Sequence, residues 1–361
     1  MPRTRTRRRR TSLRLLAAAG LTLGVAALAR SESRRRRQME LFGRVAVITG
    51  GSRGLGLVLA RELVREGARI AICARDQLEL ARACEQLEGL GAEVLALTCD
   101  VTRPEEVEEA LAQVREHLGP VDILINNAGV IQVGPLEVMT PEDYDDALRT
   151  HFWGPLHTTL AVLPEMRRRK SGRIVNIGSI GGKISVPHLL PYSVSKFALV
   201  GFSEGLRSAL ARDRVYVTTV CPGLMRTGSP RNAEFKGRHR GEFAWFSISD
   251  SLPLLSMDAT LAARRILEAC RRGDAELVMP ASAAVAVRLN ALFPEAGAAV
   301  MGLAERLLPR PGGIGTETRR GAESTSGWSP SVLTRSSDAA AARNNEVAGR
   351  DGDPDPTRRP R

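Results

Sequence analysis

The sequence predicts an α/β fold in which helices cover both faces of a doubly wound parallel sheet. Short apolar runs alternate with longer segments of helical pattern, the order that parallel strands and crossover helices require. A hydrophobic fraction of 43% supplies a substantial core, and an aromatic fraction of only 4% suits an aliphatic interior. In 361 residues, one domain of about 240 residues with terminal extensions is the economical interpretation.

Each element follows from its own pattern. Seven short apolar runs are predicted as strands, at residues 44–49, 69–74, 93–98, 123–126, 173–177, 216–220 and 276–279. Helices are predicted at residues 58–66, 77–90, 104–118 and 196–212. A further helix is expected to begin at Pro141, because Thr140 supplies a capping hydroxyl and Glu142 places an acid in the first turn.

The first predicted strand runs directly into a glycine-rich turn, and a helix follows. The turn reads Gly-Gly-Ser-Arg-Gly-Leu-Gly from Gly50 to Gly56, after Thr49. Glycines let the backbone approach a pyrophosphate closely, and the helix N-terminus offers the anion free N–H groups. The spacing Thr-Gly-x-x-x-Gly-x-Gly differs from the commoner Gly-x-Gly-x-x-Gly of dinucleotide folds. The flanking strand and helix favour a nucleotide site over a tight loop without a ligand.

Tyr192 and Lys196 form a second candidate site with the spacing Tyr-x-x-x-Lys. Residues four apart share one face of a helix, so the phenol and the ammonium can interact if this stretch is helical. Only four of the 52 basic residues are lysines. Because arginine is the usual cation of this chain, a lysine here indicates a compact ammonium that relays protons. Its charge would stabilise the anion of a phenol whose pKa is ordinarily about 10.

These residues resemble the short-chain dehydrogenase/reductase family over residues 40 to 280 or so. Further motifs of the family follow predicted strands, where an open parallel sheet binds its ligands. They are Asp100-Val101, Asn126-Asn127-Ala128-Gly129, Ser179, and Pro222-Gly223 with Thr227. The resemblance implies one Rossmann-like domain at residues 39–280 and an oxidoreductase that interconverts a carbonyl and a secondary alcohol by hydride transfer.

The resemblance also implies the catalytic residues. Tyr192 would be the acid and base, Lys196 would support it and hold the nicotinamide ribose, and Ser179 would donate a hydrogen bond to the substrate oxygen. The family's fourth catalytic residue is an asparagine that holds a relay water, and this chain has His151 there. A histidine can hold a water too, but its reach differs and its charge would change around pH 6 to 7. The effect on the proton relay stays open.

NADP is the cofactor that the resemblance favours, with NAD as the alternative. An acid after the second strand would accept from the ribose 2′-hydroxyl of NAD, whereas this chain has Arg75 there and Arg53 in the glycine turn. Two arginines could bind the 2′-phosphate of NADP, although Asp76, directly after Arg75, places a negative charge beside them. The predicted cofactor-binding residues are Gly50, Ser52, Arg53, Gly54, Leu55, Gly56, Arg75, Asp100, Val101, Asn127, Ala128, Gly129, Tyr192, Lys196, Pro222, Gly223, Met225 and Thr227.

Charge and cysteine patterns argue against other classes of function. The net charge is +12, but residues 1–37 alone carry +11 and residues 310–361 carry +2, so the body of the chain is nearly neutral. The basic leader has no interleaved aromatics, which argues against a nucleic-acid partner. Five scattered cysteines show no metal-ligand spacing, so no metal site is expected and the thiols are expected to be reduced.

Three segments lie outside the predicted domain. Residues 1–38 form a basic leader around an apolar run, Leu15 to Ala29. A span needs about 20 residues, so an interfacial anchor, a marginal transmembrane helix, a cleaved signal and a disordered leader all stay open. Residues 281–308 are predicted as an apolar helical extension, and residues 309–361 as a disordered tail. We expect membrane association with the catalytic domain facing the cytoplasm, and a cytoplasmic protein as the alternative.

The substrate is the least constrained feature. Residues 228–257 correspond to the family's variable substrate lid, which holds Phe235, Phe243, Trp245 and Phe246. Beside a membrane anchor, these aromatics favour an apolar small-molecule carbonyl or alcohol. Packing within the lid or in a contact of the expected homo-oligomer explains them equally well. A catalytically weak nucleotide-binding sensor or scaffold of the same fold is the alternative function, and His151 is the feature that favours it.

Overall fold

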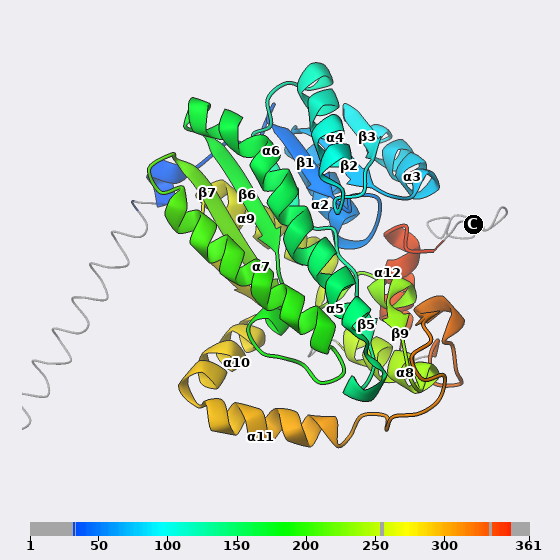
Figure 1. Ribbon diagram of the computed structural model, residues 1–361. Helices are drawn as coiled ribbons and strands as arrows, with labels where there is room; N and C mark the ends of the chain where they lie inside the picture. Colours follow the sequence, from blue (N-terminus) through cyan, green and yellow to red (C-terminus); the bar gives the residue numbers. More distant parts are fainter. Residues whose placement is uncertain (1–31, 33, 253–255, 332–333, 348–361) are drawn as a thin grey trace, which may run out of the picture.

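The computed structural model describes residues 32, 34–252, 256–331 and 334–347. Nearly all of the basic leader therefore lies outside the described residues, as do residues 348–361. A parallel seven-stranded sheet forms the centre, with strand order β11-β7-β6-β4-β1-β2-β3. Figure 1 shows the helices on both faces of this sheet. The predicted doubly wound α/β fold is confirmed.

The elements of the sheet lie within two residues of their predicted positions. The strands are β1 Val45–Thr49, β2 Arg69–Ala74, β3 Val94–Thr98, β4 Ile123–Asn126, β6 Gly172–Ile177, β7 Val215–Pro222 and β11 Glu276–Met279. The helices around them are α2 Gly54–Arg65, α3 Gln77–Glu88, α4 Pro104–His117, α5 Pro141–Leu148, α6 Gly154–Arg169, α7 Leu190–Ala209 and α9 Ala259–Arg272.

Two hydrophobic clusters, one on each face of the sheet, hold these layers together. Successive strand residues point to opposite faces. Ala46 and Ile48 of β1 accordingly pack with α2, α3 and α9, whereas Val45 and Val47 pack with α4 and α6. Because both faces are covered, the strands are apolar throughout rather than alternating.

Three local features position the site. α5 begins at Pro141 as predicted, and Thr140 and Asp143 form a capping box at its start. α7 begins at Leu190, earlier than the predicted 196, so it includes Tyr192 as well as Lys196. Between α5 and α6, Arg149–Trp153 form a π-helical turn that carries His151. Such insertions often occur at functional sites, and hydrophobic periodicity gave no sign of this one.

Smaller elements form in and around residues 228–257, the segment predicted as a substrate lid. β5 Gln132–Val133, β9 Glu234–Phe235 and β12 Arg319–Arg320 form a three-stranded sheet, and β8 Leu224–Arg226 pairs with β10 Ser256–Asp258. α8 His239–Ser251 packs next to them. Short 3₁₀ turns occur at Leu136–Val138, Ile180–Gly182, Ser229–Asn232 and Gly321–Glu323.

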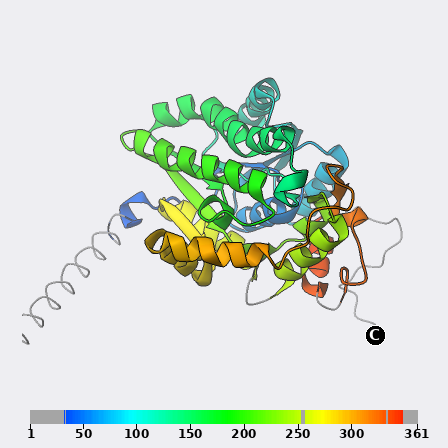
Figure 2. The same cartoon turned by 60° about the horizontal axis from the view of Figure 1, so that its bottom comes forward.

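The predicted apolar extension consists of two helices, α10 Ala281–Leu292 and α11 Pro294–Glu305. Both lie on the outside of the domain (Figures 1 and 2), and Leu292, Phe293 and Leu303 are exposed. No single helix among the described residues has the length and apolar character of a membrane span. α10 and α11 meet those criteria only as a pair, and they are bent by 119° at the break between them.

The prediction of a disordered tail is wrong for residues 309–331 and 334–347. β12 pairs with β9, and α12 Arg335–Arg343 packs on α8, with Ala340 and Ala341 buried. Ala341 lies against Gly228, where a Cβ would collide with the Ala341 backbone. Small residues allow this close approach, and polar side chains anchor the residues after α12. Neither feature produces the hydrophobic periodicity on which the prediction relied.

Candidate active site

The glycine turn has the shape that the approach of a phosphate requires. Gly50 has φ +62°, a conformation that favours glycine, and a Cβ on Gly56 would collide with the Gly50 carbonyl oxygen. Asn127 braces the turn, because its Nδ2 donates to the carbonyl oxygens of Thr49 at 3.1 Å and Gly50 at 3.0 Å. The glycines of the turn thus place no side chains of their own over the start of α2, which fits a pyrophosphate.

Two side chains at the start of α2 are tied to α3. The Ser52 hydroxyl donates to Glu79 Oε2 at 3.1 Å, and Arg53 Nη1 donates to Glu79 Oε1 at 2.8 Å. Arg53 is the N-cap residue of α2 and makes no capping hydrogen bond with its side chain. The first N–H groups of α2 therefore need partners from elsewhere. Glu79 was not among the predicted site residues, and no motif marks it.

At the end of β2, Arg75 is exposed and Asp76 has a structural role. The Asp76 carboxylate accepts a hydrogen bond from the Glu79 N–H at 2.9 Å and so caps α3. Because the Asp76 carboxylate is engaged in this cap, the neighbouring Arg75 remains the candidate contact for a ribose 2′-phosphate.

The third and fourth strand ends also carry their predicted residues. Asp100 Oδ1 accepts from the Thr102 N–H at 2.9 Å, and Val101 is buried against Gly154. The Ala128 N–H donates to Thr49 Oγ1 at 3.1 Å, which joins the end of β4 to the glycine turn. A Cβ on Gly129 would lie 2.9 Å from His151 Nε2, so this glycine makes room for the imidazole.

Tyr192, Ser179 and Lys196 come together at the ends of β6 and α7. A Cβ on Gly181 would lie 3.2 Å from Tyr192 Cε1 and 3.4 Å from Ser179 Oγ, so the hydroxyl and the phenol ring are neighbours across this glycine. Lys196 Nζ lies 5.6 Å from the centre of the Tyr192 ring. Ser179 Oγ accepts from the Gly181 N–H at 3.0 Å, which leaves the hydroxyl hydrogen available to donate.

Burial changes the pKa of both titratable groups. Burial raises the pKa of the Tyr192 phenol, while a hydrogen bond with Ser179 acts in the opposite direction. Burial lowers the pKa of Lys196 to about 7. Its ammonium donates to the Ile177 carbonyl oxygen at 2.9 Å. A lysine that titrates near neutral pH beside a phenol is the perturbed pair expected at a proton-transfer site.

His151 is buried, and both of its ring nitrogens have partners. The Val130 N–H donates to Nε2 at 3.1 Å, and Nδ1 lies 2.7 Å from Ser195 Oγ. Because the Val130 N–H can only donate, Nε2 accepts, and Nδ1 carries the proton that it donates to Ser195. The Ser195 hydroxyl in turn donates to the Tyr192 carbonyl oxygen at 2.8 Å. Sequence reasoning missed Val130 and Ser195, although Ser195 directly precedes the lysine of the motif.

Burial, and secondarily the Lys196 charge, lower the pKa of His151 well below its ordinary value. The imidazole is therefore neutral at pH 7. The expectation that its charge changes around pH 6 to 7 is wrong, because a buried ring that already has two partners gains nothing from a second proton.

The last predicted cluster follows β7. The Gly223 N–H donates to the Met279 carbonyl oxygen at 2.7 Å, which fixes the chain after Pro222. The buried Thr227 accepts at Oγ1 from the Ser229 N–H at 3.2 Å. Met225 lies in β8, paired with Met257 of β10. Asn344 links Thr227 to the glycine turn, because it contacts both.

The aromatics of the lid pack mainly with one another. Phe235, Phe243 and Phe246 are buried in a small cluster, with ring centres 5.5 Å apart for Phe235 and Phe243. Tyr192 and Trp245 pack against the same cluster. The aromatics therefore give the lid a core of its own next to the phenol.

All five cysteines are free thiols, and four of them are buried: Cys73, Cys99, Cys221 and Cys270. Burial raises the pKa of Cys221 to about 12, so this thiol stays protonated although it lies near Lys196. The cysteines act as small core residues, as expected.

Comparison with known proteins agrees with this geometry. The short chain dehydrogenase family model matches residues 44–236, more than half of the chain. A Streptomyces coelicolor protein assigned as a ketoacyl reductase is 42% identical over 185 residues, covering 51% of this chain and 71% of that protein. SadH of Mycobacterium tuberculosis, assigned as an oxidoreductase, is 36% identical over 240 residues, covering 66% of this chain and 86% of SadH.

Solved structures share the fold. A single-residue variant of actinorhodin polyketide ketoreductase, solved with NADPH, has a TM-score of 0.60 at 33% identity and covers 65% of this chain and 95% of its own. A short-chain dehydrogenase/reductase of Burkholderia phymatum in complex with NAD has a TM-score of 0.66 at 25% identity, with coverage of 71% and 96%. On the matched region and the motifs within it, this chain belongs to the short-chain dehydrogenase/reductase family of nicotinamide-dependent oxidoreductases.

Proposed function

We propose that this oxidoreductase interconverts a carbonyl and a secondary alcohol, with Tyr192 as the proton donor and acceptor and NADP(H) as the cofactor. The observation that carries the proposal is the buried lysine beside the phenol. Lys196 Nζ lies 5.6 Å from the Tyr192 ring, and its pKa is lowered to about 7. Ser179 stands next to the same ring, and its hydroxyl group can donate a hydrogen bond.

The proton steps follow from these positions. In the reducing direction, the Tyr192 hydroxyl transfers its proton to the substrate oxygen while Ser179 donates a hydrogen bond to that oxygen. The Lys196 ammonium stabilises the phenolate that remains, which offsets the rise that burial causes in the pKa of the phenol. In the oxidising direction the phenolate takes the proton from the alcohol. A nicotinamide cofactor held at the glycine turn would supply or accept the hydride.

The residues that would hold the cofactor are those of the glycine turn and the strand ends. Gly50, Gly54 and Gly56 have no side chains of their own over the start of α2, where a pyrophosphate would bind, and Arg75 with Arg53 would face a 2′-phosphate. The NADPH complex of the actinorhodin ketoreductase supports NADP, and the NAD complex of the Burkholderia phymatum protein keeps NAD as the alternative.

His151 would act through α7 rather than on the substrate. Its link through Ser195 ends on the Tyr192 carbonyl oxygen, so it fixes the turn of helix that carries the phenol. Since both ring nitrogens have partners, a relay water would need another holder, and we propose His151 as a positioning residue.

The substrate that we propose is an apolar small-molecule carbonyl. The ketoacyl and polyketide reductases among the relatives support a ketone substrate, and the phenylalanine cluster of the lid supports an apolar one.

We also propose that the chain forms homo-oligomers and associates with membranes through residues 15–29. Deleting residues 1–31 should then shift the protein from the membrane pellet to the supernatant. If the deletion leaves it in the pellet, the exposed α10–α11 pair is the better anchor candidate.

A panel of ketones tests the function. With NADPH in the assay, oxidation of the cofactor that depends on an apolar ketone, with equimolar alcohol formed, is the expected result. Cofactor binding without turnover of any ketone or alcohol would favour the sensor or scaffold function instead. Failure to bind either NADPH or NADH would contradict both.

A further inference from the structure

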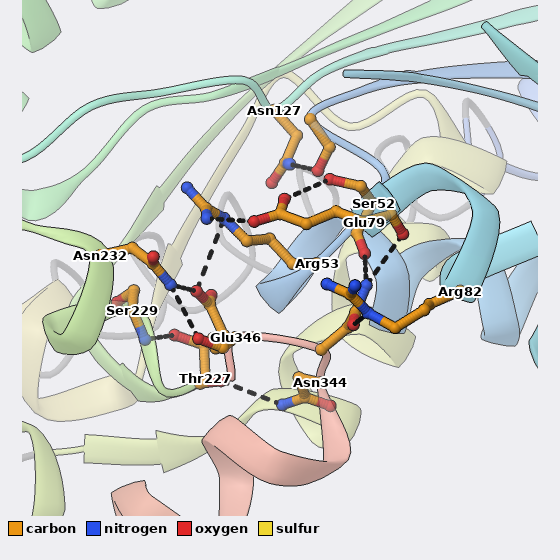
Figure 3. Close-up of polar contacts among 12 residues, drawn as sticks. Ser52, Arg53, Glu79, Arg82, Asn127, Thr227, Ser229, Asn232, Asn344 and Glu346 are labelled. Carbon is orange, nitrogen blue, oxygen red and sulfur yellow. Dashed lines mark hydrogen bonds and ion pairs between the residues drawn. The ribbon is translucent and has the colours of Figure 1, made fainter. Parts of the chain in front are cut away.

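The C-terminal segment that begins with α12 lies over the glycine turn (Figure 3). The Gly54 N–H, at the first residue of α2, donates to the Asn344 carbonyl oxygen at 2.9 Å. Asn345 Nδ2 donates to the carbonyl oxygens of Ser52 at 2.9 Å and Glu79 at 3.0 Å. Main-chain groups of the turn thus already have partners, and those partners come from almost 300 residues away in the sequence.

Glu346 places a carboxyl group where an anion would bind. A Cβ on Gly54 would lie 2.5 Å from Glu346 Oε1, so this oxygen is in contact with the turn. Arg53 Nε lies 3.6 Å from Glu346 Oε2, and Asn232 Nδ2 donates to Oε2 at 2.6 Å. Figure 3 shows Glu346 between Arg53 and Asn232. The carboxyl therefore meets the helix N-terminus and the cation that a phosphate would meet.

The segment also contacts residues after β7 and in α8. Asn344 Nδ2 donates to the Thr227 carbonyl oxygen at 3.2 Å. The Ser337 hydroxyl donates to Asp250 Oδ2 in α8 at 2.8 Å, and Ala341 lies against Gly228. α12 and the residues after it therefore join the glycine turn to the lid.

The neighbours of the buried Glu346 carboxyl affect how much its burial costs. Burial raises the pKa of Glu346 to about 7, and the nearby Glu79 acts in the same direction, while Arg53 and the hydrogen bond from Asn232 oppose it. Near neutral pH the group is thus partly protonated, and a protonated carboxyl costs little to bury. The segment can therefore stay docked on the glycine turn without a fully compensating charge.

We propose that residues 335–346 and the nicotinamide cofactor compete for the glycine turn, so that the chain's own C-terminal segment controls access of the cofactor. This inference rests on the proposed function of the turn. A pyrophosphate at the start of α2 needs the Gly54 N–H and the space that Glu346 fills, and both cannot be occupied at once. The apparent affinity for the cofactor is then reduced by the fraction of molecules in which the segment is docked.

A matched pair of substitutions at neighbouring alanines of α12 tests the competition. Ala341→Gln puts a larger polar side chain against Gly228, which should undock α12 without changing charge or helix propensity greatly. Ala342→Gln makes the same change at the exposed neighbouring residue. We expect Ala341→Gln to lower the apparent Kd for NADPH about tenfold or more, and Ala342→Gln to leave it within twofold or so of the parent. Asn345→Ala removes the hydrogen bond to the Ser52 carbonyl oxygen of the turn, together with those to Glu79 and from Arg82 of α3, and should act like Ala341→Gln.

Hydrogen exchange in the full-length protein measures directly whether residues 335–346 are docked. In the parent without cofactor, amides of residues 335–346 should be protected, and saturating NADPH should remove that protection. Ala341→Gln should lose it without cofactor. Two results would overturn the competition while leaving the proposed function intact: NADPH bound with the segment still protected, or equal Kd values for the parent and Ala341→Gln.

The same data identify a failure of the proposed function. If Ala341→Gln frees the segment and yet neither it nor the parent binds NADPH or NADH, the glycine turn is not a cofactor site, and control of cofactor access fails with it.

Discussion

His151 Nδ1 lies 2.7 Å from Ser195 Oγ, and this contact ties the imidazole to the helical turn that carries Tyr192. The ring is buried, neutral and engaged at both nitrogens. His151 is thus part of the packing that holds the helical turn of Tyr192.

His151→Ala should lower both kcat and stability. It leaves the Val130 N–H without its acceptor, which costs about 1–3 kcal/mol, and it removes one of the two hydrogen bonds of the Ser195 hydroxyl. His151→Asn should retain much of the activity, since an amide can still both donate and accept. Steady-state kinetics and denaturant unfolding of the two variants check this. If His151→Ala matched the parent in both, His151 would be a bystander.

The lowered pKa of His151 predicts a pH dependence of stability. The folded state resists protonation of the ring, whereas the unfolded state binds a proton below about pH 6.5. The contribution of His151 is therefore fully present above that pH and is lost as the pH falls towards the lower folded-state value, by at most about 1.4 kcal/mol per pH unit. The free energy of unfolding of the parent should fall more steeply between pH 6.5 and 5 than that of His151→Asn. Parallel curves would contradict the neutral, buried imidazole.

Gly56→Ala should abolish cofactor binding and destabilise the domain, because the new methyl group would collide with the Gly50 carbonyl oxygen. Gly205→Ala is the matched control. Gly205 is an exposed glycine in α7 with nothing near its missing Cβ, so alanine there should stabilise the protein by about 0.5–1 kcal/mol. Thermal unfolding and NADPH titration of both variants distinguish a requirement of the turn from a general intolerance of added methyl groups.

Arg75→Asp should weaken NADPH and improve NADH. The exposed arginine at the end of β2 would meet a 2′-phosphate, and an aspartate would repel it and accept from a 2′-hydroxyl. Arg53 should preserve part of the preference, although its guanidinium is shared with Glu79. The ratio of kcat/KM for the two cofactors measures the effect. An unchanged ratio would rule out this role for Arg75.

Much of this site was predictable because its chemistry lies in short local motifs. The strand and glycine-turn patterns placed Gly50 to Gly56, and the Tyr-x-x-x-Lys spacing placed Tyr192 and Lys196, because a strand end and one helical face need only neighbouring residues. The partners of His151 could not be read in this way, since Val130 and Ser195 meet it only through the tertiary fold. The docking of Asn344 to Glu346 was missed for the same reason. Their polar composition is typical of a disordered tail, and their partners Gly54, Ser52, Thr227 and Asn232 are far away in the sequence.

Tyr192→Phe tests the central claim most directly. The substitution removes only the transferable proton, so the Kd for NADPH should stay close to that of the parent while kcat for ketone reduction falls by about 10²- to 10⁴-fold. Both quantities should be measured on the same preparation, by titration of the cofactor and by its absorbance during turnover with a saturating apolar ketone. A variant with unchanged cofactor binding and less than about one hundredth of the parental rate is the predicted result. A rate above that level would show that the proton comes from another group, and the assignment of Tyr192 as the acid and base would be wrong.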